Sequence, residues 1–370
     1  MIWFSRFRSS MESRKQSHHT RRRRLPASTA DALLTWYDSH RRDLPWRAKP
    51  DEIADPYRVW ISEIMLQQTT VAAVTGYFGR FMTRWPNVST LAAASQDEVL
   101  QTWAGLGYYA RGRNLHRGAG VVMEQFGGVI PRDPAQLITI PGIGPYTANA
   151  IAAIAFGEPV AAIDTNAERV LARLLAFEQP LPDRRRLLAA RADGLVPRDR
   201  PGDFAQALMD LGSAICMPEN PSCSECPLSD WCYAYRKHET HRFPQKKAKA
   251  ARKLTRAIAF VATDSVGAVY LVRRPGNGLF GGMMQPPLTD LAKRFPATKH
   301  ALSRAPFRGE WFRKPGIVRH TLTHRELEVR AYVAHFPRHP NGEGVWLSQS
   351  DFESAALPTL MRKIISHALR

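Results

Sequence analysis

The sequence predicts an all-α domain followed by a smaller mixed α/β domain. Between about residues 29 and 231, Ala, Leu and Val recur at helical spacing, and Gly and Pro gather between the segments. From residue 257 onward, short apolar runs alternate like strands around a glycine-rich stretch at 276–282. A length of 370 residues lets each domain bury a core of its own.

Changes in composition divide the chain into four segments. We expect a basic tail at 1–26, the helical domain at 27–235, a basic linker at 236–256 and the α/β domain at 257–370. The formal net charge of +19 favours nucleic acid as a partner. The helical domain, however, holds more acidic than basic residues. DNA binding by this domain must therefore depend on local features.

The tail is rich in Arg and Ser and is best interpreted as a disordered basic arm that attracts phosphates. Its composition also allows an organelle transit peptide, and Met11 offers a later start of translation. The tail lacks the apolar core of a secretion signal, and no apolar run in the chain is long enough to span a membrane. We expect a cytoplasmic, nucleoid-associated protein, with mitochondrial and nuclear locations left open.

The C-terminal segment contains three predicted strands and one predicted helix. The strands are expected at Ala257–Phe260, Val269–Val272 and Glu328–Ala334, and the helix at Ser354–Leu369. This mixture of short strands and a closing helix predicts the α/β domain.

All four cysteines of the chain lie within one window, with the spacing C-x6-C-x2-C-x5-C: Cys216, Cys223, Cys226 and Cys232. Four thiolates at short spacing suit a tetrahedral metal ion or an iron–sulfur cluster. Disulfides are the alternative, but they belong mainly to small secreted domains. The spacing alone does not separate zinc from a [4Fe–4S] cluster.

The segment DPYRVWISEIMLQQT predicts a helix that carries an acid among apolar neighbours. The Asp-Pro pair at 55–56 is a good N-cap and first helical residue. Glu63 then shares a helical surface with Val59, Trp60 and Leu66. Apolar surroundings should raise its pKa and suit it to general acid catalysis. The alternative is an ordinary glutamate paired with a basic group.

A glycine hairpin follows at 137–157, LITIPGIGPYTANAIAAIAFG. Gly142 and Gly144 lack side chains, so backbone N–H groups at a helix N-terminus can approach a DNA phosphate. A plain turn between two helices is the alternative.

The segment EPVAAIDTNAERVLARLL predicts another helix start. We expect Thr165 and Glu168 to form a capping box. Asp164 precedes this box, and its carboxylate either serves the turn or stabilises a cationic transition state.

Together these pieces resemble the helix–hairpin–helix, iron–sulfur DNA glycosylases, and among them the adenine DNA glycosylases of the MutY type. The resemblance rests on five segments in order: SEIMLQQT, GLGYYARGRNLH, IPGIGPYTANAIA, IDTNAERVLAR and the four cysteines. It implies a [4Fe–4S] cluster rather than zinc, with Glu63 as the catalytic acid and Asp164 as the second carboxylate. Tyr146 stands where bifunctional relatives have a nucleophilic lysine, which implies a monofunctional enzyme.

The resemblance also implies how a flipped adenine is handled. Tyr146 and Asn166 would orient the two carboxylates, and Arg47 would touch the base. Further implied DNA contacts are the wedge residues Leu106 and Tyr108 and the partner-base residues Gln68 and Thr69. Without the family, Tyr108 would be interpreted as a core aromatic.

The C-terminal domain resembles the MutT-like domain with which this family recognises 8-oxoguanine. The segment VRHTLTHRELEV would place Thr323 and His324 beside the damaged base. The family commonly has Phe-Ser-His where this chain has Leu322-Thr323-His324, so the aromatic is lost. Residues 282–310 lack the glutamate-rich helix of a Nudix pyrophosphatase, so we expect binding without hydrolysis.

The function implied is removal of adenine opposite 8-oxoguanine or guanine in duplex DNA, by a monomer that contacts repair proteins through its linker. A bifunctional glycosylase/lyase is the nearest rival, and Tyr146 disfavours it. A non-catalytic iron–sulfur DNA-binding protein is the other, and the presence of both Glu63 and Asp164 speaks against it.

Overall fold

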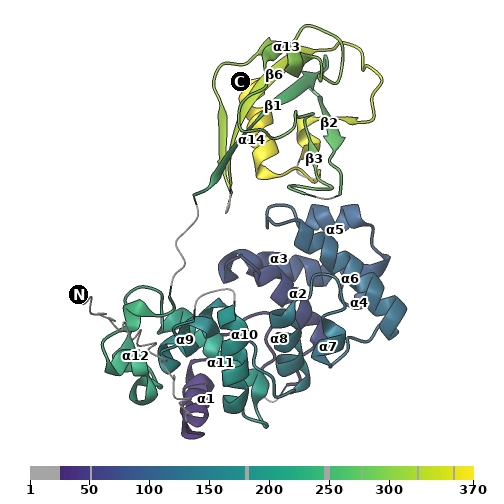
Figure 1. Ribbon diagram of the computed structural model, residues 1–370. Coiled ribbons are helices and arrows are strands. Elements are labelled where there is room, and N and C mark those ends of the chain that lie inside the picture. Colours follow the sequence, from purple (N-terminus) through teal and green to yellow (C-terminus); the bar gives the residue numbers. More distant parts are fainter. Residues whose placement is uncertain are drawn as a thin grey trace, which may run out of the picture.

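The computed structural model describes residues 26–50, 52–179, 183–245, 251–276, 278–322, 325–352 and 355–370. The predicted tail at 1–26 therefore lies almost wholly outside the described residues, as do Thr323 and His324. Helices fill the N-terminal part and a sheet forms the C-terminal part, which lies above the helices in Figure 1. The predicted fold class is confirmed.

The helical domain contains twelve α-helices within the described ranges. They are α1 (Ser28–His40), α2 (Pro56–Leu66), α3 (Val71–Arg84), α4 (Val88–Ala93), α5 (Gln96–Thr102), α6 (Ala110–Phe126), α7 (Pro134–Leu137), α8 (Pro145–Phe156), α9 (Thr165–Leu175), α10 (Asp183–Ala192), α11 (Pro201–Ala214) and α12 (Tyr233–Arg236). Four 3₁₀ turns accompany them: η1 (Asp193–Leu195), η2 (Cys223–Glu225), η3 (Ser229–Trp231) and η4 (Thr240–Arg242). None of the helices in the described segments combines the length and the hydropathy needed to cross a bilayer.

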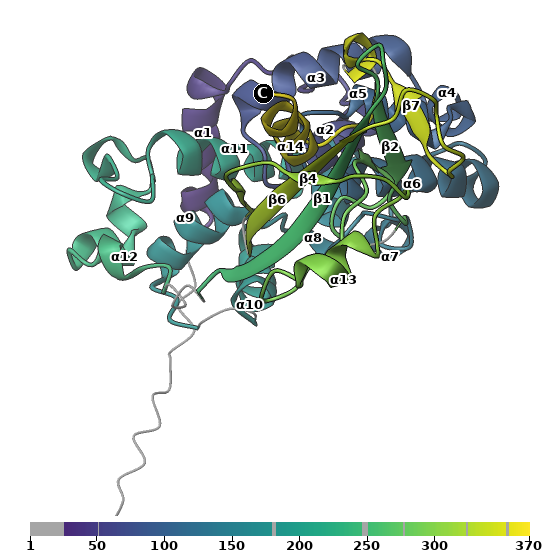
Figure 2. The same cartoon turned by 90° about the horizontal axis from the view of Figure 1, so that it is seen from above.

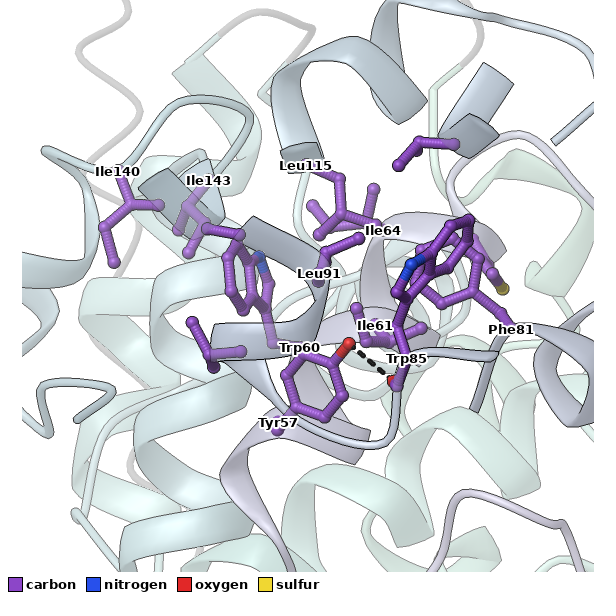
Figure 3. Close-up of a cluster of buried hydrophobic side chains, with 14 of the residues drawn as sticks. Tyr57, Trp60, Ile61, Ile64, Phe81, Trp85, Leu91, Leu115, Ile140 and Ile143 are labelled. Atoms are coloured by element: carbon purple, nitrogen blue, oxygen red, sulfur yellow. Dashed lines mark hydrogen bonds between the residues drawn. The ribbon is translucent and has the colours of Figure 1, made fainter. Parts of the chain in front are cut away.

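Within the described residues these helices pack around two large hydrophobic cores, and a small third cluster contains Ala150, Ala162 and Ala205. The first core lies among α2 to α8, and Figure 3 shows Trp60, Ile61 and Ile64 of α2 within it. In the same view the Tyr57 hydroxyl donates to the carbonyl oxygen of Trp85 at 2.9 Å. The second core joins α1 with α9, α10, α11 and the cysteine segment. Because α8 packs against both α2 and α11, it lies where the two cores meet.

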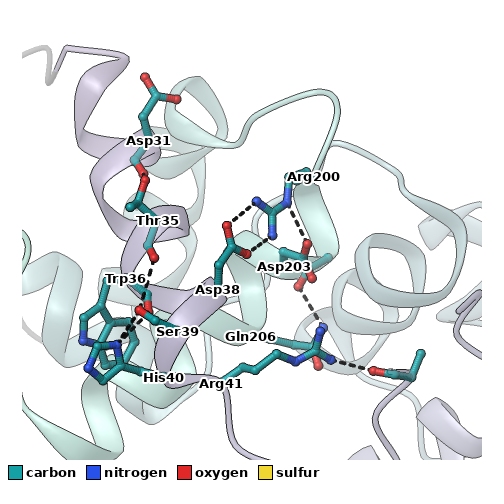
Figure 4. Close-up of polar contacts among 12 residues, drawn as sticks. Asp31, Thr35, Trp36, Asp38, Ser39, His40, Arg41, Arg200, Asp203 and Gln206 are labelled. Atoms are coloured by element: carbon teal, nitrogen blue, oxygen red, sulfur yellow. Dashed lines mark hydrogen bonds and ion pairs between the residues drawn. The ribbon is translucent and has the colours of Figure 1, made fainter. Parts of the chain in front are cut away.

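A polar contact fastens α1 to α11 on the surface of the second core. Figure 4 shows the Arg200 guanidinium between Asp38 of α1 and Asp203 of α11, with Nε donating to Asp203 at 2.8 Å. All three side chains are partly exposed, so we expect the contact to orient α1 rather than to add much stability.

The C-terminal domain is a seven-stranded sheet. Its strands are β1 (Lys253–Thr263), β2 (Val269–Arg273), β3 (Met284–Gln285), β4 (Phe312–Arg313), β5 (Val318–Thr321), β6 (Arg325–His335) and β7 (Val345–Leu347). The order is β3-β2-β1-β6-β4, with β5 pairing with β6 and β7 with β2. The long strands β1 and β6 are parallel neighbours, from the pair Lys253 and Arg325 to the pair Thr263 and His335. They lie side by side in Figure 2.

Helices cover both faces of this sheet, which explains its nearly continuous apolar strands. Ala259 and Val261 of β1 face the core that contains α14 (Thr359–Leu369). Ile258 and Phe260 face the opposite core, which contains α13 (Thr298–Leu302). The turn η5 (Gln349–Phe352) leads toward α14. The predicted strands are present, and β1 begins at Lys253, inside the segment that was predicted as linker.

The two domains share an apolar contact. Met283 and Ala356 of the C-terminal domain are buried within the first core of the helical domain. Arg273 pairs with Asp97 at 2.7 Å across the boundary, and Arg113 donates to the carbonyl oxygen of Gly281. The C-terminal domain therefore covers the end of the helical domain that holds α5 and α6 (Figure 1).

Candidate active site

Glu63 and Tyr146 face one another from α2 and α8. The Tyr146 hydroxyl donates to Glu63 Oε2 at 2.7 Å, and the glutamate is only 7% exposed. Burial raises the pKa of Glu63 to about 7; the bond from Tyr146 opposes this rise and the charge of Asp164 adds to it. The predicted rise is confirmed, and the carboxyl group can hold a proton near neutral pH. As predicted, α2 begins at Pro56 with Asp55 as its N-cap.

Asp164 lies at the start of α9, close enough to Glu63 to raise its pKa. Its Oδ1 accepts from the Ala167 N–H at 2.6 Å, so Asp164 itself is the N-cap. Burial raises the pKa of Asp164, while backbone hydrogen bonds from Ala167 and Asn166 counteract the rise. The helix start was predicted correctly but its cap was not, because Glu168 pairs with Arg184 and Arg185 instead of capping.

The Asn166 side chain contacts Arg169, whose Nε donates to the carbonyl oxygen of Cys216. Its Oδ1 accepts from Arg169 Nη2 at 2.9 Å, and its backbone N–H supports Asp164. A Cβ placed on Gly212 of α11 would lie 2.6 Å from Asn166 Cβ, so only glycine allows this close helix contact.

Arg47 lies in a small cavity with Glu63 and is held by an ion pair. Its Nη1 lies 2.6 Å from Oδ2 of Asp210, a fully buried carboxylate that Arg42 also contacts. The cavity has a volume of about 50 Å³ and also includes Gln206 of α11.

Sequence reasoning missed Gln206 and Asp210. They lie four residues apart within the mostly apolar stretch FAQALMDLG, which places both on one face of α11. Two polar residues on one face of an otherwise buried helix were the available signal.

Four of the predicted DNA-contacting residues, Gln68, Thr69, Leu106 and Tyr108, occupy the loops after α2 and before α6. Gln68 has φ 58° and Tyr108 has φ 47°, both in the left-handed region. Tyr108 is 47% exposed, whereas Leu106 is buried in the first core at 7%. The exposed ring is thus available to a base, and Leu106 is available only if the loop moves. The Thr69 hydroxyl accepts from Arg111 at 3.0 Å.

A cavity of about 630 Å³ lies between the domains, beside Tyr108. His320 and Leu322 contribute to its wall from the C-terminal domain. Leu322 is the last described residue before the predicted lesion-reading pair Thr323 and His324.

The glycine hairpin joins α7 to α8. Gly142 has φ +88°, and a Cβ there would lie 3.0 Å from Asn114 Cβ, so both conformation and space favour glycine. Gly144 is the N-cap of α8, and a Cβ there would meet no other atom within 4 Å. There is therefore open space beside Gly144, and binding of a DNA phosphate at this helix start stays a prediction.

The four cysteines are free thiols around one side of the second core. Cys216, Cys226 and Cys232 pack against that core, and Arg173 Nη1 lies 3.3 Å from Cys216 Sγ. Within the described ranges, no three His, Cys, Asp or Glu side chains converge tightly enough for one metal ion. The four thiols are donors that suit either a zinc ion or an iron–sulfur cluster.

Comparisons with known proteins agree with this geometry. The family model described as HhH-GPD superfamily base excision DNA repair protein matches residues 61–192, and the NUDIX domain model matches residues 258–367. The adenine DNA glycosylase of Homo sapiens is 35% identical, over 90% of this chain and 72% of the human protein. This chain belongs to the adenine DNA glycosylase family.

Other relatives extend the match. The adenine DNA glycosylase of Buchnera aphidicola subsp. Baizongia pistaciae is 31% identical, over 90% of this chain and 95% of its own length. A thermostable thymine-DNA glycosylase has a similar structure, with a TM-score of 0.51 and 31% identity, over 57% of this chain and 96% of that one. The chain is accordingly a base excision repair DNA glycosylase, a hydrolase of N-glycosyl bonds.

Proposed function

We propose that this adenine DNA glycosylase is monofunctional and releases adenine paired with 8-oxoguanine or guanine, leaving an abasic site. The observation that carries the proposal is the buried pair of Glu63 and Tyr146, in which a carboxyl group with a pKa of about 7 meets a tyrosine hydroxyl. A pKa near the working pH is what a general acid requires.

In the proposed reaction, Glu63 donates its proton to a ring nitrogen of the flipped adenine. The C1′–N9 bond then breaks, and both of its electrons leave with the base as neutral adenine. The sugar becomes an oxocarbenium-like cation, which the negative charge of Asp164 stabilises. Water adds to C1′ and loses a proton, so the net reaction is hydrolysis.

The proposed pocket has positioning groups around both carboxylates. Tyr146 fixes Glu63, and Asn166 contributes a backbone N–H to Asp164. Arg47 is held beside Glu63 by Asp210 and is placed to contact the base. Since the cavity of about 50 Å³ is smaller than a purine, we expect it to widen as the base enters.

A monofunctional outcome follows from the chemistry of Tyr146. A strand-cutting lyase forms a Schiff base through an amine, and a tyrosine hydroxyl cannot form one. The buried Glu63 and the half-buried Asp164 then leave hydrolysis as the available route.

Recognition of the partner base is assigned to the cavity between the domains. Tyr108 and Arg111 line the helical side, and His320 and Leu322 line the side of the C-terminal domain. Hydrolysis by this domain is not proposed, because Asp290 pairs with Arg304 and residues 282–310 hold only one other acid, Glu310.

Cys216, Cys223, Cys226 and Cys232 would hold a [4Fe–4S] cluster. When bound, the cluster would cross-link the segment after α11. The residues of the chain itself support this shape, since Arg173 donates to the carbonyl oxygens of Met217 and Pro218. We also propose a monomer whose basic tail and linker add salt-dependent attraction to phosphates, with the linker open to repair proteins.

Single-turnover base release from a duplex with adenine opposite 8-oxoguanine tests the proposal. Duplexes with A:T and with thymine glycol run beside it, each developed with and without alkali. We expect a break only in the strand with adenine opposite 8-oxoguanine, and only after alkali. Strand cutting without alkali, or preference for thymine glycol, would place the enzyme among the lyases.

A further inference from the structure

Arg111, the second residue of α6, caps the helix that carries Glu63. Its guanidinium is buried, and Nη1 donates to the carbonyl oxygens of Ile64 at 3.0 Å, Met65 at 2.8 Å and Gln67. Carbonyl groups in the last turn of a helix have no partner within the helix, and they form the negative end of its dipole. Arg111 therefore fixes the end of α2, one turn beyond Glu63.

The same guanidinium also holds the two loops that flank the predicted DNA contacts. Its Nη2 donates to the carbonyl oxygens of Leu106 at 3.3 Å and Gly107 at 3.2 Å. It also donates to the Thr69 hydroxyl at 3.0 Å, and the guanidinium carbon lies 5.4 Å from the centroid of the Tyr108 ring. One planar group thus connects α2, the loop after it and the loop before α6.

Both loops contain a strained residue beside the atoms that Arg111 holds. Gln68 follows Gln67 and has φ 58°, and Tyr108 follows Gly107 and has φ 47°. Residues with side chains occupy this region only when their surroundings impose it, and such strain gathers at functional sites. Arg111 is hydrogen-bonded to the residue that precedes each of them, Gln67 and Gly107.

We propose that Arg111 is a positioning residue that holds Tyr108, Gln68 and Glu63 in one rigid unit. Insertion of the Tyr108 loop at the mispair then brings the flipped adenine to Glu63. This inference rests on the proposed function. Arginine is needed because its planar guanidinium group donates hydrogen bonds to carbonyl groups in three directions. A lysine keeps the charge but offers donors from a single point.

The test compares Arg111→Lys with the matched control Arg117→Lys, which alters an exposed arginine of the same helix. Adenine release is measured in single turnover at saturating enzyme, well below the melting temperature of each variant. Base flipping is followed in parallel by the fluorescence of 2-aminopurine in place of adenine. We expect Arg111→Lys to slow release by about 100-fold, the scale of an ångström-sized misplacement, and to reduce the flipping signal. Arg117→Lys should behave like the wild type.

If the role of Arg111 is purely structural, Arg111→Lys will have a lower melting temperature but an unchanged release rate and flipping signal at temperatures where it is folded. This result would overturn the inference. Should Arg111→Lys fail to fold, Arg111→Gln is compared with Arg117→Gln. The change at Arg111 should reduce the flipping signal and the release rate while the change at Arg117 leaves both unaltered; equal behaviour of the two variants contradicts the inference. The wild-type arm reports separately on the proposed function, because absence of adenine release there refutes that function alone.

Discussion

Replacing Tyr146 with phenylalanine should move the pH dependence of base release. The hydroxyl of Tyr146 donates to Glu63 and favours its ionised form, so it lowers a pKa that burial has raised to about 7. Activity needs Glu63 protonated and Asp164 ionised, so the wild-type rate should be constant between their two pKa values and fall about tenfold per pH unit above about 7.

The size of the shift follows from the lost hydrogen bond. A bond to a charged group is worth about 1.5 kcal/mol at the low end of the usual range, and 1.36 kcal/mol corresponds to one pKa unit. Tyr146→Phe should therefore raise the pKa of Glu63 by about one unit and move the descending limb to about pH 8. Glu63 is buried, so little of this effect should be screened by salt.

The assay is single-turnover adenine release from pH 5 to 10, with the 8-oxoguanine duplex at saturating enzyme. Tyr57→Phe is the matched control, because Tyr57 lies on α2, the helix that carries Glu63, and its hydroxyl donates to the Trp85 carbonyl oxygen. The control should keep the wild-type limb. If the pH at which the rate of Tyr146→Phe begins to fall is unchanged or lower than in the wild type, the assignment of Glu63 as the acid is refuted.

Three further predictions concern other parts of the structure. Asp164→Asn should keep the N-cap and the melting temperature but slow single-turnover release by about 10²–10³-fold, because the charge facing the cation is lost; an unchanged rate contradicts this. Cys226→Ser should lower the iron and sulfide content and the visible absorption of the purified protein, whereas full iron content would remove Cys226 from the ligands. Met283→Ala should destabilise the docked domains by about 2–5 kcal/mol in denaturant unfolding, and a change below 1 kcal/mol would show that the contact is loose.

Local sequence signals predicted much of the helical domain and the acid. Asp55 followed by proline predicted the start of α2. The apolar neighbours of Glu63 predicted that its pKa is raised. These features depend on residues within two helical turns of one another, so the sequence alone shows which of them are neighbours.

Long-range features could not be predicted in this way. The docking of Met283 into the first core and the contact of Arg47 with Asp210 join residues far apart in the chain, and no periodicity reports on such pairs. The cap of α9 was missed because the geometry, rather than the sequence, decided between Asp164 and Thr165. Helix α14 begins at Thr359 rather than at Ser354, because Pro358 cannot lie inside a helix.

The most direct test of the central claim is adenine release by Glu63→Gln beside the wild type. Glutamine keeps the shape of the side chain and a group that can accept from Tyr146, but it has no proton to give to the base. The account predicts normal binding of the 8-oxoguanine duplex, measured by titration, with no adenine released in single turnover. Release at the wild-type rate would contradict the account, since the proton would then have to come from another group.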